Sequence, residues 1–148
     1  MLKPIAFATA VAGTLDILFA VILTLWFGRE PANMLRYVAS GPFPAATEWG
    51  GWGAVLGLIV HFTLIAIMAT VFVAAARRLP DMTRAPVKWG IVYGLVTYAV
   101  MNLVVVPLRF QAGLLPSVRS LMTQLFAHIV LVGLPIALIA ARTARSRN

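Results

Sequence analysis

The fold of this chain is decided by residues 51–76, which read GWGAVLGLIVHFTLIAIMATVFVAAA. The stretch holds no Lys, Arg, Asp or Glu, and its apolar side chains do not alternate with polar ones as they would in a half-buried strand. About 20 such residues in a helix cross the hydrocarbon core of a bilayer. Because lipid offers the backbone no hydrogen-bond partners, the stretch predicts a transmembrane α-helix.

Three further stretches have the same character, and charged residues, prolines or tryptophans bound each of them. Of the 148 residues, 61% are hydrophobic and 11% are charged, whereas soluble domains have about 25% charged residues. So short a chain could not bury that much apolar surface in water. We therefore predict an all-α fold, a transmembrane four-helix bundle that forms a single membrane domain over residues 1–148. Its predicted spans cover residues 5–27, 51–76, 87–107 and 121–141.

The basic residues predict how the chain is oriented, because Lys and Arg concentrate in the cytoplasmic connections of membrane proteins. If the N-terminus is cytoplasmic, eight Lys and Arg residues fall on that side and four on the other, so we expect both termini in the cytoplasm. The net charge of +8 then faces lipid head groups, and no nucleic-acid partner is expected. The cytoplasmic set is Lys3, Arg77, Arg78, Arg84, Lys88, Arg142, Arg145 and Arg147, and the outer set is Arg29, Arg36, Arg109 and Arg119.

The first outer connection, residues 28–50, contains a segment that suits a short helix. Pro31 favours a first helical position, and Gly41 favours a helix stop. Apolar side chains between them share one face at helical spacing, so we predict an interfacial helix over residues 31–40. The tryptophans that fall near the predicted membrane interfaces, where amphipathic rings prefer to lie, are Trp26, Trp49, Trp52 and Trp89.

Two prolines fall in or at the end of predicted spans. Pro107 is expected to end the third helix, because the residue before a proline avoids helical geometry. Pro135 lies inside the fourth span and should kink it. The connection that follows the third helix, residues 108–120, contains Gly113 and Pro116, which favour turns.

Several polar side chains lie inside the predicted spans. Ionisable groups are costly within a bilayer, so Asp16, His61 and His128 suggest a functional site. Asp16 and His61 lie at similar depth, which makes the histidine the natural partner of the carboxylate. Two interpretations stay open: a hydrogen bond that joins two helices, or a pair that titrates protons or binds a cation. Asn102 is expected to hydrogen-bond to His128 or Gln124. The predicted buried polar cluster consists of Asp16, His61, Tyr98, Asn102, Gln124 and His128.

Small residues recur four positions apart on two of the spans. Gly53 and Gly57 do so on the second span, and Gly90 and Gly94 on the third. Residues four apart share a helix face, and small ones let transmembrane helices approach closely. We predict that both pairs serve helix packing; self-association through one of these faces is the alternative.

The residue types limit the cofactors that the chain can hold. It has no cysteine, so thiolate zinc sites and iron–sulfur clusters are excluded, and we predict no metal site. His61 and His128 could be axial ligands of a haem b, although His128 lies about one helical turn nearer the outer surface. No nucleophile elbow, phosphate loop or nucleotide fingerprint is present, so we expect no enzymatic activity.

A set of short motifs runs along nearly the whole chain. They are Gly13-Thr14-Leu15-Asp16-Ile17, Ala39-Ser40-Gly41, Gly57-Leu58-Ile59-Val60-His61-Phe62, Tyr93-Gly94, Met101-Asn102-Leu103-Val104-Val105-Val106-Pro107-Leu108, and His128 with Gly133-Leu134-Pro135. With these motifs the chain resembles a group of small bacterial inner-membrane proteins for which no reaction is established. It departs from the group at Pro42-Phe43-Pro44, where leucines and a glycine are expected, and at Arg109, where a serine is expected. The resemblance implies four helices in a bacterial inner membrane and no particular reaction.

Three functions are open at this point. We expect a non-enzymatic integral membrane protein, either an accessory or interaction subunit of a larger membrane complex or a homo-oligomer, whose polar cluster holds the helices together. The alternative is a small transporter or channel that conducts protons or a cation through Asp16, His61, Asn102 and His128. The third is a redox protein that binds haem or a quinone.

Overall fold

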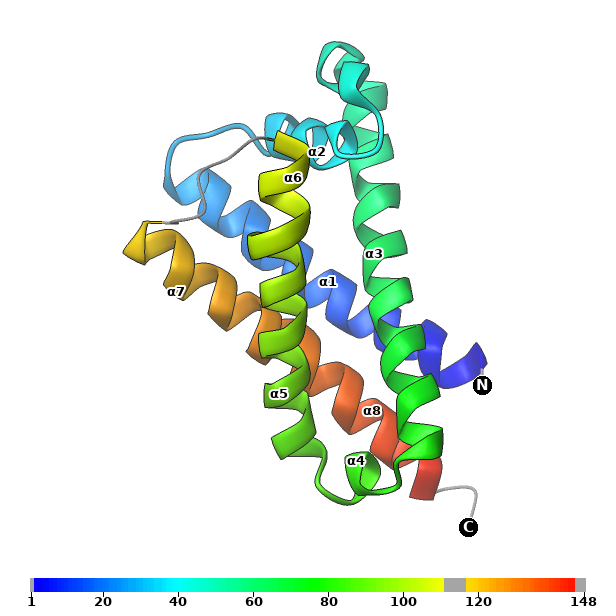
Figure 1. The fold of residues 1–148 in the computed structure, drawn as a ribbon. Helices are drawn as coiled ribbons and strands as arrows, with labels where there is room; N and C mark the ends of the chain where they lie inside the picture. Colours follow the sequence, from blue (N-terminus) through cyan, green and yellow to red (C-terminus); the bar gives the residue numbers. More distant parts are fainter. Residues whose placement is uncertain (1, 111–116, 146–148) are drawn as a thin grey trace.

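Four long apolar helices make up most of the structure, a computed structural model that describes residues 2–110 and 117–145 (Figure 1). Each helix is long and apolar enough to cross a membrane, and the described residues contain no strand. The predicted all-α fold with four candidate membrane-spanning helices is confirmed. These helices run over Leu2–Trp26, Gly50–Arg78, Pro86–Phe110 and Val118–Arg145.

Two of the four are single α-helices, and two are composite. Short helices occupy the connections on either side of the second span. In chain order the elements are α1 (Leu2–Trp26), α2 (Pro31–Ser40), the 3₁₀-helix η1 (Pro44–Glu48), α3 (Gly50–Arg78), α4 (Asp81–Arg84), α5 (Pro86–Tyr98), the π-helix η2 (Ala99–Val105), α6 (Val106–Phe110), α7 (Val118–Phe126), the π-helix η3 (Ala127–Gly133) and α8 (Leu134–Arg145).

Each π-helical segment ends two residues before a proline. η2 ends at Val105, ahead of Pro107, and η3 ends at Gly133, ahead of Pro135. A proline lacks an N–H group, and in an α-helix its ring clashes with the carbonyl four residues earlier. In the wider π turn each N–H bonds to the carbonyl five residues earlier, so the helix continues without this clash. The prediction that Pro107 ends the third helix is therefore wrong, because the helix continues to Phe110. The predicted turn residues Gly113 and Pro116, like Arg147, lie outside the described residues.

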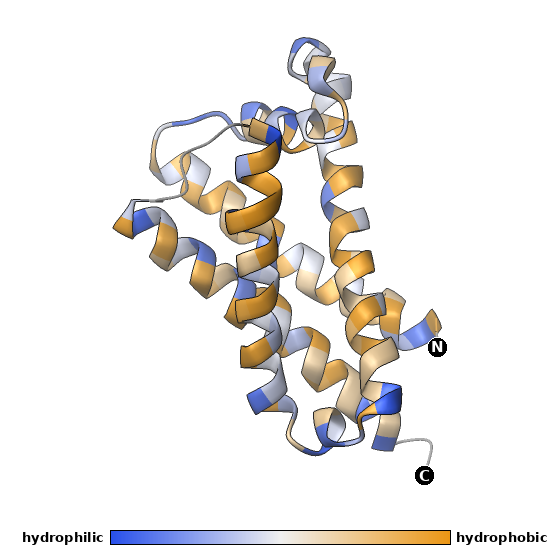
Figure 2. Ribbon diagram, viewed as in Figure 1, coloured by the Kyte–Doolittle hydropathy of each residue, from blue (hydrophilic) through white to orange (hydrophobic). Residues whose placement is uncertain are grey.

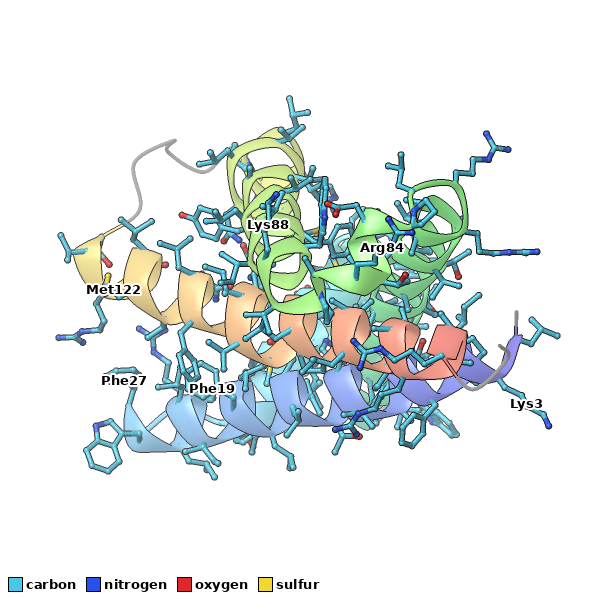
Figure 3. The ribbon with its side chains drawn as sticks, turned by 90° about the horizontal axis from the view of Figure 1, so that it is seen from below. Lys3, Phe19, Phe27, Arg84, Lys88 and Met122 are labelled. Carbon is cyan, nitrogen blue, oxygen red and sulfur yellow. The ribbon has the colours of Figure 1, made fainter. Side chains whose placement is uncertain are left out.

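The four long helices form two layers that cross each other. α1 and the continuous helix α7–η3–α8 lie side by side (Figure 3), and α3 and α5 pack across them (Figure 1). Alanines mark the contact: Ala8 and Ala12 on α1, Ala69 on α3 and Ala137 on α8 are completely buried. Such small side chains let helix backbones approach closely, so van der Waals packing holds the layers together. Phe72 on α3 is the largest fully buried side chain.

The outward faces of the long helices are apolar. Hydrophobic residues follow the helices and hydrophilic ones gather at their ends (Figure 2). Large side chains such as Phe7, Ile22, Ile67 and Val96 stand exposed along their length. Soluble proteins do not show so broad an apolar surface, whereas hydrocarbon requires it.

The short helices close the two ends of the molecule. α2 lies across the end of α3, beside the end of α6 (Figure 1). The helix predicted over residues 31–40 is present with those bounds, while its place at a membrane interface stays a prediction. At the opposite end α4 connects α3 to α5, and the indole N–H of Trp89 donates to Asp81 Oδ2 at 2.8 Å.

Candidate functional site

The centre of the candidate site is a pair of ionisable side chains between α1 and α3. Nδ1 of His61 lies 3.8 Å from Oδ2 of Asp16, and the two side chains are 11% and 24% exposed. The other ring nitrogen, Nε2, lies 3.0 Å from the backbone oxygen of Gly13. A Cβ at Gly13 would come within 2.5 Å of the Phe62 ring, so glycine at this position lets α3 approach α1. Both nitrogens of the histidine thus meet α1.

The hydrogen bond to Gly13 identifies one protonated ring nitrogen. A carbonyl oxygen only accepts, so Nε2 of His61 carries a proton and donates it. A second proton, on Nδ1 or on Asp16, would make the pair neutral overall. This neutrality is what a bilayer interior requires of buried ionisable groups.

His128 contributes a second imidazole from η3. Its Nδ1 lies 2.9 Å from the backbone oxygen of Gln124, four residues earlier, and its ring stands edge-on to Tyr98 at 5.9 Å between centroids. Asp16 interacts electrostatically with His128 as well as with His61. The structure therefore brings together Asp16, His61 and His128 from three helices, with Tyr98 beside them.

The two amides predicted for the cluster have other surroundings. The side-chain amide of Asn102 donates to the backbone oxygen of Tyr98 at 3.4 Å. Among the described residues, neither His128 nor Gln124 is its hydrogen-bond partner, so the predicted bond is wrong. The π turn of η2 places Asn102 where its own helix offers the nearest acceptor. The side chain of Gln124 is exposed, and only its backbone reaches the cluster.

The glycines of α5 face the last long helix. A Cβ at Gly94 would come within 2.5 Å of Ile129 Cα and 2.6 Å of the His128 backbone oxygen, and one at Gly90 would touch Leu134 at 3.0 Å. Gly133, which spacing alone did not single out, lies against the backbones of both α5 glycines. This close approach holds His128 at its depth beside α5.

Gly53 and Gly57 have a different partner from the one that their spacing suggests. A Cβ at Gly57 would clash with the backbone of Leu35 in α2, and one at Gly53 with the backbone oxygen of Ala46 in η1. The pair accommodates the connection that precedes α3 and does not join two spanning helices. Glycines four residues apart predict that another element packs closely against the helix. They do not show which element this is.

The surroundings of His61 do not favour haem ligation. Its Nε2 donates to the Gly13 backbone oxygen, and its Nδ1 faces Asp16 at 3.8 Å. In addition, α1 packs against both α3 and η3, the two segments that carry the histidines. Within residues 2–110 and 117–145, no group of three or more His, Cys, Asp or Glu side chains could hold a metal ion.

The sequence pattern did not predict two contacts between helices, because each involves a single residue that belongs to no repeating pattern. The Tyr93 hydroxyl donates to the backbone oxygen of Met68 at 2.7 Å and so bridges α5 to α3. Arg109 donates from Nε to the backbone oxygen of Gly41 at 2.6 Å and from Nη2 to that of Ser40 at 2.7 Å.

A cavity of about 680 Å³ lies between α3 and the η2–α6 segment, under the end of α2. None of Asp16, His61 and His128 lines it, so the cavity and the ionisable cluster are separate sites. Its walls are mainly apolar. The lining residues are Tyr37, Val38, Gly41, Pro42, Phe43, Leu56, Ile59, Val60, Thr63, Leu64, Met101, Val105, Val106, Arg109 and Phe110.

Comparison of the chain with models of protein families, with curated proteins and with solved structures gives no match. The resemblance to small bacterial inner-membrane proteins therefore stays a prediction.

Proposed function

We propose that this chain is a non-enzymatic multi-pass protein of a bacterial inner membrane, an accessory or interaction subunit of a larger membrane complex or a homo-oligomer. In this proposal the ionisable cluster is structural. The observation that carries it is the pairing of His61 with α1 through both ring nitrogens. Lipid tails are as apolar as leucine, so helices in a bilayer need packing and hydrogen bonds to stay together.

The proposed orientation places both termini in the cytoplasm and α2 at the outer surface of the membrane. Eight basic residues against four support it. Three of the four arginines assigned to the outer side contact other groups of the protein. Arg36 lies 4.0 Å from Glu30, and Arg109 binds the end of α2. Arg119 stacks over the ring of Phe27. Arginines that bind other groups of the protein are weaker signals for a cytoplasmic location than solvated arginines are.

The alternative is a small transporter or channel for protons or a cation, and one observation favours it. Asp16 interacts with two histidines, and Nδ1 of His61 lies 3.8 Å from its Oδ2. Proton relays in membranes are built from such groups. The separation of the cluster from the cavity argues for the structural role, because a transport path needs access from both sides.

Flux and stability measurements distinguish the two. We expect liposomes that contain the protein to show no proton or potassium flux above that of empty liposomes. We also expect Asp16→Asn to lower the melting temperature. The matched control, Glu48→Gln at an exposed position, should leave the melting temperature unaltered. Flux through the unaltered protein that Asp16→Asn abolishes without loss of stability would overturn the structural role. A Soret band in the absorption spectrum of the purified protein would overturn both the structural role and the transport role and would indicate a haem protein.

The partner is tested by extraction from native membranes in a mild detergent. A subunit or homo-oligomer should migrate as an assembly well above the 16.0 kDa of one chain plus its detergent, and cross-linking should give a defined product. A particle that contains one chain at every detergent concentration would contradict the proposal.

A further inference from the structure

The cavity under α2 has two helical walls. Leu56, Val60 and Leu64 line it on α3, and Met101 and Val105 line it on η2. Eight residues separate the first and last of these positions on α3, which corresponds to about 12 Å along the helix axis. A volume of about 680 Å³ lies within the range of about 300–1,000 Å³ that small-molecule sites occupy.

The cavity is bounded at both ends, which limits what can enter it. At one end α2 and the Gly41–Phe43 segment cover it. At the other end, one turn beyond Leu64, the Tyr93 hydroxyl binds the Met68 backbone oxygen and ties the two walls together. This hydrogen bond limits how far an occupant can extend along α3. The mainly apolar walls suit a flexible hydrocarbon chain.

Arg109 gives the cavity its single charged lining side chain. Two of its five N–H groups bind backbone oxygens at the end of α2, and three remain. Among the described residues, no carboxylate lies within ion-pair distance of its guanidinium. An otherwise apolar space with an uncompensated guanidinium at its covered end suits an amphiphile with an anionic head.

We propose that this cavity binds one acyl chain of an anionic phospholipid, with the phosphate at Arg109 and the chain between α3 and η2. The guanidinium is held in place by α2, and its planar fork of donors matches a phosphate. The apolar walls receive the hydrocarbon chain. Pro42 and Phe43, beside the end of α2, line the same cavity as Arg109.

Native mass spectrometry of the protein, released from vesicles of equal parts phosphatidylglycerol and phosphatidylcholine, tests the proposal. Both head groups carry a phosphate, but the choline cation makes that of phosphatidylcholine neutral overall. We therefore expect one retained phosphatidylglycerol and a preference over phosphatidylcholine of about fivefold, the order by which net negative lipid charge favours a nearby basic residue. Arg109→Gln should abolish this preference, and Arg109→Lys should retain part of it. Arg119→Gln, at the same end but outside the cavity, should leave it unchanged.

A pair of neighbouring valines tests the position of the acyl chain. Val105 lines the cavity and is 41% exposed, whereas Val104 is 48% exposed and is not one of the lining residues. Val105→Phe should reduce the retained lipid about tenfold, and Val104→Phe should not change it. Circular dichroism and the melting temperature verify that each variant is folded. Equal retention of the two lipids, equal effects of the two valine variants, or a neutral occupant unaffected by Arg109→Gln would overturn the proposal.

Discussion

His61 is the residue through which α3 recognises α1. Replacing it with Leu removes the hydrogen bond to the Gly13 carbonyl and the imidazole that lies 3.8 Å from the Asp16 carboxylate. We expect the free energy of unfolding to fall by about 1–3 kcal/mol, the cost of buried polar groups without partners. The hydrogen bond of His128 lies within its own helix, so His128→Leu leaves no backbone group of another helix without a partner and should cost less than about 1 kcal/mol. Unfolding by sodium dodecyl sulfate in mixed micelles measures both.

The double variant supplies the control for this prediction. If Asp16 and His61 are each other's partners, changing both to Leu removes the unpaired groups as well as the pair. The loss should then be smaller than the sum of the two single losses by about 1 kcal/mol or more. Strictly additive losses would show that the two side chains do not depend on each other.

At Gly94 the absence of a Cβ atom allows two helices to pack closely. Its missing Cβ lets the backbones of α5 and η3 meet, with Ile129 Cα 2.5 Å from the place that a Cβ would occupy. Gly94→Ala should push the helices apart and reduce the free energy of unfolding by about 1–3 kcal/mol. At Gly51 a Cβ meets nothing within 4 Å, so Gly51→Ala should be neutral or stabilise by up to about 1 kcal/mol. The same losses at both sites would refute the packing role.

The docking of α2 onto α3 is a property of two elements. Gly57 admits the backbone of Leu35, so a larger residue there should detach α2. The chain has no cysteine, and Ala39 on α2 is completely buried, which makes Ala39→Cys a clean reporter. We expect a water-soluble maleimide to label Cys at this position at least about tenfold faster in a Gly57→Leu background.

Two controls accompany the labelling. Gly51→Leu places the same side chain on α3 in open space, and it should leave position 39 protected. Asn33→Cys, on the exposed face of α2, should react rapidly in every background. Protection of position 39 in both leucine variants would mean that Gly57 does not control the docking of α2.

The elements differ in how far the sequence could anticipate them. The apolar run from Gly51 to Ala76 and its three counterparts fixed the number of long helices, because only length and composition matter for that property. The continuation of the third helix past Pro107 could not be anticipated, since the local rule for proline assumes an α-helix and the structure has a π turn. The partners of Gly57 and Asn102 depend on helix rotation, which a single sequence does not encode.

In the whole molecule, basic residues at the two ends are distributed unequally. Arg84 and Lys88 lie at the end that carries α4 (Figure 3), while α2 lies at the opposite end (Figure 1). The concentration of Lys and Arg at cytoplasmic ends predicts that the α4 end faces the cytoplasm. This orientation would also place Arg109 and the proposed lipid site in the outer leaflet.

Single cysteines at the two ends test this orientation directly. Asn33→Cys lies on α2, and Leu79→Cys, at a position that is 52% exposed, lies between α3 and α4. In intact inner-membrane spheroplasts a membrane-impermeant maleimide should label Cys at position 33 and not at position 79, because only the outer surface is accessible. After permeabilisation both should react, which shows that position 79 was shielded by the bilayer and not by the fold. Labelling of position 79 before permeabilisation, with position 33 protected, would reverse the topology and move the lipid site to the cytoplasmic leaflet.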